Sequence, residues 1–130
     1  MHLLSIDYLE TLFNNQKETA LFGKWIRFKD ISVLFAKHQQ RFQIKELGTS
    51  EEERPIYQFK IGKGSKRILI WSQMHGNEST GTKALFDLFN GFTNSTSKEL
   101  STILNECTIM CIPMLNPDGS KAYTRVNANN

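Results

Sequence analysis

The chain has 130 residues and a formal net charge of +3, with 16 Lys and Arg against 13 Asp and Glu. This length predicts one domain large enough to bury a core, and nine phenylalanines supply large apolar side chains for it. The sequence has neither a basic stripe nor a long apolar window, so we expect neither a nucleic-acid partner nor a membrane partner.

The first 41 residues predict a helical lead-in. Ser5 is a favourable N-cap for a first helix that closes in the polar stretch 14–17, and Asp30 is expected to cap a second helix that ends near Gln40. The apolar residues that recur at helical spacing in these two segments are Ile6, Leu9, Leu12, Phe13, Ile31, Leu34 and Phe35.

The middle of the chain predicts three strands, near residues 42–47, 56–61 and 68–73. The second alternates apolar and polar side chains, as a half-buried strand does. Residues 62–65 have the composition of a hairpin turn between the second and third strands. The third strand is more continuously apolar, so we expect it inside the sheet.

A helix and a buried strand are predicted after Glu78. The helix gives way to a loop at Gly91, and residues 96–99 match a capping box for a short helix. Residues 108–113 predict a buried strand, and residues 116–119 have the composition of a turn. This order of elements predicts an α/β fold with a mixed β-sheet flanked by helices. The apolar stripe of the long helix consists of Ala84, Leu85, Leu88, Phe89 and Phe92.

The two cysteines, Cys107 and Cys111, are expected on one face of the last strand. Four residues of extended chain separate their α-carbons by about 13 Å, whereas a disulfide needs less than about 7 Å. We therefore expect reduced thiols and a reducing compartment. The start of the chain lacks the pattern of a signal peptide, so a cytoplasmic location is the expectation.

His75 and Glu78 are the first candidate site residues. They follow the apolar strand 68–73, three positions apart. Loops after strands are where α/β sheets bind ligands, and zinc accepts both imidazole and carboxylate. If the loop curls into a helical turn, both side chains can reach one ion. A polar loop without a metal stays open as the alternative, because a catalytic zinc site needs three protein ligands.

Arg125 is the third candidate. It follows the turn 116–119, which comes after the second buried strand. If the two buried strands are parallel neighbours, both loops open at the same edge of the sheet and Arg125 lies within reach of His75 and Glu78. A guanidinium there can stabilise a developing oxyanion or hold a carboxylate with two hydrogen bonds. From the residue alone, a solvated arginine is the alternative.

Three motifs together resemble the N-terminal part of the M14-type zinc carboxypeptidases. They occur in the family's order and approximate spacing, and they cover about residues 43–130. The motifs are Glu-Arg-Pro-Ile-Tyr at 53–57 with Lys-Ile-Gly at 60–62, His-Gly-Asn-Glu at 75–78 with Thr-Gly-Thr at 80–82, and Asn-Pro-Asp-Gly at 116–119 with Arg125.

The resemblance implies a fold and a domain organisation. The implied fold is a truncated zinc-carboxypeptidase-like α/β fold of the phosphorylase/hydrolase-like type. Residues 1–130 would form the N-terminal portion of a catalytic domain. Within it, residues 1–41 would be the helical lead-in, and residues 42–130 would hold the sheet and the metal-site loops.

The resemblance also implies roles for the three candidates. His75 and Glu78 would be two of three zinc ligands, and Arg125 would be catalytic and substrate-binding, polarising the scissile carbonyl. The third ligand and the general-base glutamate would lie beyond residue 130. The implied activity of the intact protein is hydrolysis of C-terminal peptide bonds by metal-activated water. We expect the 130 residues alone to bind zinc weakly and to be inactive.

Two other functions stay open. A zinc-dependent deacylase of N-acyl amino acids can carry a similar His-Gly-Asn-Glu loop, although the Asn-Pro-Asp-Gly turn favours the peptidase. The other is a non-catalytic binding module that has lost its metal. His2 and His38 lie far in sequence from both loops, so we expect them to be surface or structural residues.

The apolar strand 68–73 also predicts an interaction. By resemblance this strand is central in the complete sheet, beside a later strand that these 130 residues do not contain. An apolar strand with one unpaired edge invites pairing with another molecule. We therefore expect self-association through an exposed sheet edge, with a terminal loop or helix covering that edge as the alternative.

Overall fold

A four-stranded mixed sheet carries the fold, and the computed structural model describes residues 5–94 and 96–129 of the chain. The strands are β1 (Gln43–Thr49), β2 (Pro55–Ile61), β3 (Lys66–Trp71) and β4 (Cys107–Ile112). Their order in the sheet is β1-β2-β4-β3. β2 is antiparallel to both β1 and β4, whereas β3 and β4 are parallel.

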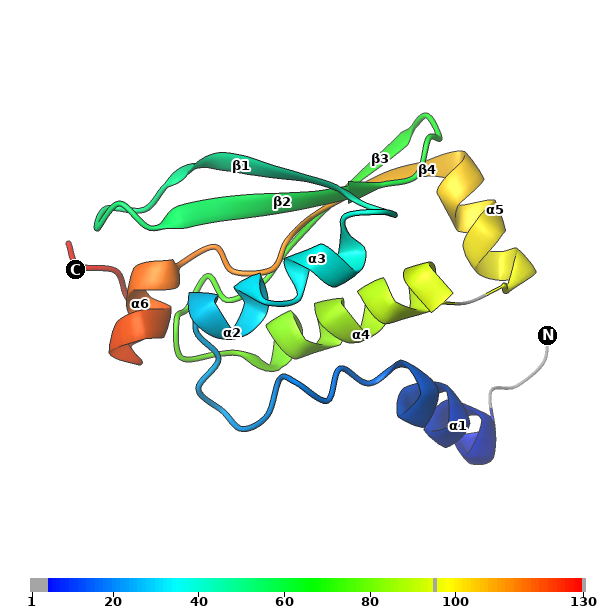
Figure 1. Cartoon of the computed structure of the whole chain (residues 1–130), viewed down its shortest axis with the longest axis horizontal. Helices are drawn as coiled ribbons and strands as arrows, with labels where there is room; N and C mark the ends of the chain where they lie inside the picture. Colours follow the sequence, from blue (N-terminus) through cyan, green and yellow to red (C-terminus); the bar gives the residue numbers. More distant parts are fainter. Residues whose placement is uncertain (1–4, 95, 130) are drawn as a thin grey trace.

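The helices are α1 (Ile6–Gln16), α2 (Phe28–Ser32), α3 (Phe35–His38), α4 (Thr80–Asn94), α5 (Lys98–Glu106) and α6 (Pro117–Ala122). α2, α3 and α4 lie along one side of the sheet, and α6 lies near the end where β4 finishes (Figure 1). The predicted α/β fold with a mixed sheet flanked by helices is therefore confirmed. No helix in the described ranges is long and apolar enough to cross a membrane.

Phenylalanines fill the space between the sheet and α4. Phe59 of β2 and Phe86 and Phe89 of α4 are fully buried. The rings of Phe59 and Phe89 stack with their centroids 5.0 Å apart. Such aromatic pairs contribute roughly 0.5–1.5 kcal/mol beyond the burial of their area. The alternation predicted for β2 is confirmed, because Phe59 and Ile61 face this core while Lys60 is exposed.

Both cysteines are free, as their spacing in β4 predicted. Cys111 is buried against the core, and this burial raises the pKa of its thiol to about 12. A thiol with so high a pKa stays protonated near neutral pH and reacts slowly.

The lead-in differs from the prediction in two respects. Ser5 does cap α1 by accepting a hydrogen bond from Tyr8 N, but α1 has no buried residue, so its apolar stripe stays exposed. Two short helices, α2 and α3, replace the single helix expected after Asp30. Asp30 is the third residue of α2, not its N-cap, and its carboxylate accepts from Arg27 N at 2.9 Å.

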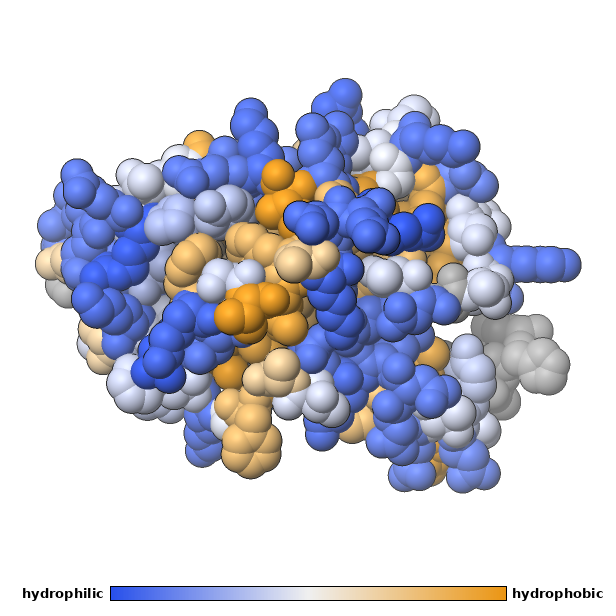
Figure 2. All heavy atoms as spheres, viewed as in Figure 1, coloured by the Kyte–Doolittle hydropathy of each residue, from blue (hydrophilic) through white to orange (hydrophobic). Residues whose placement is uncertain are grey.

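Val33 follows the end of α2 and is 71% exposed. The face of the molecule drawn in Figure 2 is mostly hydrophilic, with hydrophobic side chains gathered near its middle, over α2 and α3.

The expected hairpin at residues 62–65 was wrong, because β4 lies between β2 and β3. The glycines there serve close packing instead. A Cβ added at Gly62 would lie 2.2 Å from Cys107 O, and one at Gly64 would lie 1.7 Å from Glu106 C. This connection therefore passes directly against the junction of α5 and β4, where only glycine leaves enough room.

The prediction that residues 68–73 form an interior strand was also wrong for the described sheet, in which β3 is an edge strand. Its register with β4 pairs Ile70 with the buried Cys111, and Ile70 packs against the core, whereas Ile68, which pairs with Ile109, is 39% exposed. Leu69 and Trp71 point to the opposite face and are 52% and 50% exposed. Apolar composition therefore did not mark a central position here.

Three boundaries in the last third of the chain also differ. α4 continues through Gly91 to Asn94, so no loop begins at Gly91. Ser97, rather than Thr96, caps α5 by accepting from Leu100 N. The segment 116–119, expected as a turn, begins α6 with Pro117 in its first turn. Proline suits that position because the first helical N–H groups have no partner inside the helix.

Candidate metal and substrate site

The loops after β3 and β4 leave the sheet side by side. Ser72 N donates to Ile112 O at 3.0 Å, and Leu115 N donates back to Ser72 O at 3.0 Å. Asn116 N then donates to Gln73 O at 3.0 Å, one step further out. Because the two strands are parallel neighbours, their loops open at the same edge, which is the arrangement that the sequence required for a shared site.

His75 and Glu78 lie on one backbone turn between β3 and α4. Glu78 N donates to His75 O at 3.0 Å, which closes that turn before α4 begins at Thr80. His75 is half-buried, whereas the side chain of Glu78 is 57% exposed. Both residues line a cavity of about 370 Å³. The predicted curl of the loop into a turn is thus observed.

Arg125 lies in the loop after α6, and its guanidinium Nη1 donates a hydrogen bond to Glu78 Oε1. Arg125 and His75 both line a second cavity of about 440 Å³, together with Asn116 and Glu51. The structure therefore brings the three predicted site residues to one edge of the sheet, with two of them in direct contact.

Close packing fixes the two loops against each other. Asn77 N donates to Thr124 O at 3.0 Å, and Asn116 Nδ2 donates to Met74 O at 3.3 Å. A Cβ added at Gly76 would lie 1.9 Å from Gly119 C. Any side chain at Gly76 would therefore push the loop that carries His75 away from the start of α6.

Asp118 binds the tip of the β1–β2 hairpin to this edge. Its side chain is 1% exposed, and its carboxylate accepts from Ser50 Oγ at 2.7 Å, Glu52 N at 3.1 Å and Arg54 Nη1 at 2.5 Å. Burial alone would raise the pKa of this carboxyl, but the bonds from Ser50, Arg54 and Glu52 outweigh it and lower the pKa. The tip of the β1–β2 hairpin is thereby held where Ser50 and Glu51 line the larger cavity.

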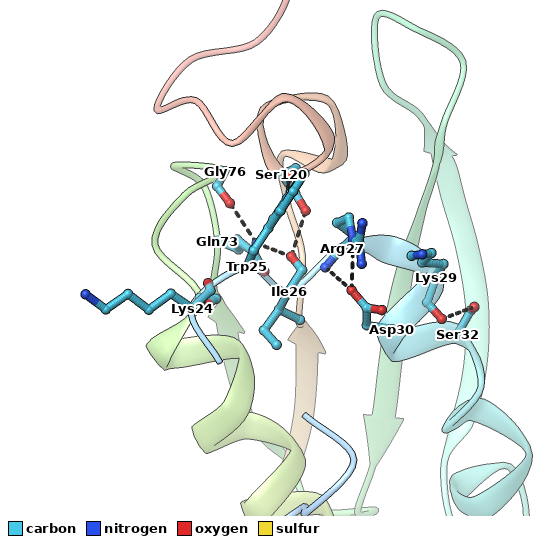
Figure 3. A network of polar contacts seen from close by, with 11 residues as sticks. Lys24, Trp25, Ile26, Arg27, Lys29, Asp30, Ser32, Gln73, Gly76 and Ser120 are labelled. Atoms are coloured by element: carbon cyan, nitrogen blue, oxygen red, sulfur yellow. Dashed lines mark hydrogen bonds and ion pairs between the residues drawn. The ribbon is translucent and has the colours of Figure 1, made fainter. Parts of the chain in front are cut away.

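The segment 24–27 crosses beneath both loops (Figure 3). Ile26 O accepts from Gln73 Nε2 and from Ser120 Oγ, each at 2.8 Å. Lys24 O accepts from Ser79 Oγ at 2.5 Å, and Trp25 Nε1 donates to Ser120 O at 2.7 Å. One extended stretch of the lead-in therefore ties the loop after β3 to α6.

Left-handed backbone also gathers at this edge. Among the described residues, the non-glycine positions with positive φ are Glu53, Gln73 and Tyr123, at 59°, 49° and 57°. They lie in the hairpin tip, in the loop after β3 and at the end of α6. Such conformations cost on the order of 1–3 kcal/mol each and are concentrated at functional sites.

Sequence reasoning missed the roles of Gln73, Asp118 and Ser120. Asp118 lies in the Asn-Pro-Asp-Gly motif and Arg54 in the Glu-Arg-Pro-Ile-Tyr motif, so the two motifs together carried a signal for this pairing. Nothing in the sequence marks Gln73 or Ser120, because the carbonyl that both share, Ile26 O, lies 47 and 94 positions away from them.

His38 lies in the core and not at this edge. His38 is fully buried, and its ring lies within 6 Å of those of Phe42, Phe86 and Phe89. His38 is thus a core residue, as expected, whereas His2 lies outside the described residues. Within the described ranges, no group of three or more His, Cys, Asp or Glu side chains could hold a metal ion.

The chain is similar to known proteins. The family model described as zinc carboxypeptidase matches residues 29–130. The gamma-D-glutamyl-L-diamino acid endopeptidase 1 of Lysinibacillus sphaericus is 34% identical over 80 residues, which are 56% of this chain. The inactive metallocarboxypeptidase ECM14 of Ajellomyces dermatitidis is 27% identical over 126 residues, which are 88% of this chain. The chain spans 20% of the length of each of these relatives.

A solved structure shows the same fold. The metallo-carboxypeptidase of Burkholderia cenocepacia superposes with a TM-score of 0.72 at 22% identity. The match covers 78% of this chain and 30% of that one. The carboxypeptidase-like fold predicted from the three motifs is therefore confirmed.

Proposed function

Because this chain belongs to the zinc carboxypeptidase family, we propose that the whole protein is a zinc-dependent metallocarboxypeptidase that hydrolyses C-terminal peptide bonds. In this proposal His75 and Glu78 are two zinc ligands, and Arg125 binds the peptide substrate and polarises its scissile carbonyl. The observation that carries the proposal is the pairing of Arg125 with Glu78, at a sheet edge where His75 lines the same cavity as Arg125.

The donor chemistry fits zinc as far as this chain provides it. Imidazole nitrogen and carboxylate oxygen bind zinc at about 2.0–2.2 Å. His75 and Glu78 offer one of each from a single closed turn and line one cavity. Because the described residues hold no group of three metal-binding side chains, the proposal takes the third ligand and the general base from outside residues 1–130.

Zinc, when bound, would supply an activated water and polarise the substrate carbonyl. The residues of this chain supply position and charge. The Arg125 side chain is a guanidinium with five N–H donors, so it can neutralise an oxyanion without a proton transfer. The link from Asn77 N to Thr124 O holds the backbone beside Arg125 before substrate arrives. Such preorganisation is what makes a charged donor effective in the transition state.

A non-catalytic binding module is the second candidate function. The relative that matches most of this chain's length among those compared above is named an inactive metallocarboxypeptidase, which favours this alternative. The two candidates differ in one measurable property, the stoichiometric binding of zinc at His75 and Glu78.

Zinc content decides between these candidates. The whole protein that contains this chain is dialysed against zinc, and the bound metal is measured for wild type, His75→Ala, Glu78→Gln and the control Glu10→Gln, whose carboxylate lies on the exposed helix α1. The proposal predicts stoichiometric zinc that both site variants lose and the control keeps. Equal zinc binding by all four proteins would contradict it.

Substrate assays on the protein that contains this chain test the reaction. The proposal predicts release of C-terminal residues from peptides, and a loss of roughly 10²–10³-fold in kcat in Arg125→Ala, as for other oxyanion donors. Hydrolysis of N-acyl amino acids without any release from peptides would replace the peptidase by a zinc-dependent deacylase. The isolated 130 residues are expected to hydrolyse neither substrate.

A further inference from the structure

Gln73 is a buried residue with left-handed backbone beside the proposed ligands. It is 3% exposed, its φ of 49° is left-handed, and it stands two positions before His75. Glutamine has no special tolerance for the left-handed region, so the surrounding structure must hold it there. We propose that Gln73 is a positioning residue that fixes the turn carrying His75 and Glu78. This proposal rests on the function proposed above for that turn.

The side-chain amide of Gln73 connects three segments of the chain. Its Nε2 donates to Ile26 O at 2.8 Å and to Gly76 O at 2.7 Å. Its Oε1 lies 2.8 Å from the hydroxyl of Thr82, in the first turns of α4. The orientation of the amide is fixed, because both neighbours of Nε2 are carbonyl oxygens and can only accept.

The bond to Gly76 O acts within the turn itself. Gly76 lies between His75 and Glu78, so this bond fixes the peptide that joins the two proposed ligands. The bond to Ile26 O anchors that peptide to the lead-in, and Figure 3 shows Gln73 and Ser120 converging on the same carbonyl. The turn is thereby held from inside the protein, while its ligand side chains face the cavities.

Thr82 completes the arrangement. Its hydroxyl is fully buried and also lies 2.7 Å from Pro113 O, at the end of β4. A hydroxyl has one proton, so Thr82 shares it between Gln73 Oε1 and Pro113 O. The amide of Gln73 thus links the turn to α4 directly and, through the Thr82 hydroxyl, to the loop after β4.

Only glutamine satisfies all these contacts. A glutamate has the same shape but would direct a carboxylate oxygen at two carbonyl oxygens, so that Gly76 O loses the donor it has in Gln73 and Ile26 O keeps only Ser120 Oγ. An asparagine is one methylene shorter and cannot span from Ile26 to Thr82 in this geometry. Partners that orient metal ligands typically change metal affinity by about 10- to 100-fold when they are removed.

The test separates positioning from general stability. We compare Gln73→Glu with Asn90→Ala, a control that removes a side chain equally buried in α4. The Nδ2 group of Asn90 donates to Gln16 O at 2.9 Å, far from the site. A milder pair, Thr82→Val and Thr82→Ser, removes or keeps the hydroxyl that faces Gln73 Oε1 and serves if Gln73→Glu does not fold.

Two readouts are taken on the folded variants. Amide hydrogen exchange follows the N–H groups of Asn77 and Glu78, which bond to Thr124 O and His75 O. Zinc affinity is measured by titration with the metal alone. We expect faster exchange at both amides and roughly tenfold weaker zinc binding in Gln73→Glu and Thr82→Val. Asn90→Ala and Thr82→Ser should retain wild-type values.

Each result decides one question. If exchange at Asn77 and Glu78 in Gln73→Glu and Thr82→Val matches that in Asn90→Ala, Gln73 does not position the turn and the inference is overturned. If wild type binds no zinc, the proposed function fails, and the exchange data still decide the role of Gln73. Faster exchange with unchanged zinc affinity would also overturn the inference, because the fixed turn would then not serve the metal.

Discussion

Arg125 donates a hydrogen bond to Glu78, which lies 47 positions earlier in the chain. The contact exists because β3 and β4 are parallel neighbours and their loops leave the sheet together. His75 lines one cavity with Arg125 and another with Glu78. One imidazole, one carboxylate and one guanidinium therefore lie at one edge of the sheet, and the proposed function rests on this arrangement.

Removing the Arg125 guanidinium should leave stability nearly unchanged. The side chains of Arg125 and Glu78 are 60% and 57% exposed, and exposed ion pairs contribute about 0–1 kcal/mol. Urea unfolding of Arg125→Ala should therefore give a free energy of unfolding within about 1 kcal/mol of wild type. A loss of several kcal/mol would show that the pair is structural and would weaken the functional assignment of Arg125.

Replacing Asp118 should be far more damaging. Asp118→Ala leaves the Arg54 guanidinium, whose side chain is 19% exposed, without its buried partner. Breaking such a pair typically costs about 3–5 kcal/mol, and Glu52, which also pairs with Arg54, should hold the loss near the lower end. The double variant Arg54→Ala/Asp118→Ala should lose less than the sum of the single losses. Additive losses in urea unfolding would contradict the pairing.

His38 should make stability fall between about pH 6.5 and pH 4. Burial in the phenylalanine core, and then the charge of Lys37, lowers the pKa of His38 from 6.5 to about 4. In that window the unfolded chain binds a proton that the folded chain rejects, so stability is present above pH 6.5 and is lost as pH falls toward 4. The total effect is about 3 kcal/mol, at 1.36 kcal/mol for each pKa unit.

The measurement is urea unfolding at pH 7, 6, 5 and 4 for wild type and for His38→Leu. The slope between pH 6.5 and 4 should largely disappear in the variant. The pKa values of Glu18 and Asp118 are lowered in the folded chain, so protonation of these two carboxyls should still reduce the free energy of unfolding of the variant as the pH falls below about 4. A wild-type free energy of unfolding that stays flat from pH 7 to pH 5 would exclude a neutral, buried His38.

The outer edge of β3 should mediate self-association. No strand of the described chain pairs with that edge, and Leu69 and Trp71 beside it are about half exposed. An unpaired apolar edge is a template for a second strand. Sedimentation should show dimers or larger species that Trp71→Lys reduces to monomer. The control Leu47→Lys, on β1 at the other edge of the sheet, should leave association unchanged. A wild-type chain that stays monomeric at high concentration would contradict this prediction.

Local patterns in the sequence predicted the elements that bury one face. The alternation in β2 and the apolar stripe of α4 are both present, because periodicity reports burial directly. The nearness of Arg125 to the loop after β3 followed from the expectation that two buried strands are parallel neighbours, as β3 and β4 are. These predictions needed only short segments and a general rule of α/β sheets.

Tertiary neighbours explain where prediction failed. β3 looked interior because it is apolar, but its place in the sheet depends on which strand pairs with its outer edge. Gly62 and Gly64 looked like a hairpin turn but make room for the backbone of α5 and β4. Gln73 gave no signal at all, since its partners are Ile26 O, Gly76 O and Thr82 Oγ1. Such contacts are visible only in three dimensions.

Anomalous diffraction at the zinc edge, from crystals grown with zinc, tests the shared site most directly. We predict a zinc peak about 2.0–2.2 Å from an imidazole nitrogen of His75 and a carboxylate oxygen of Glu78. The Arg125 guanidinium should face the open side of that ion. A peak bound elsewhere on the protein, with His75 and Glu78 turned away from each other, would contradict the account.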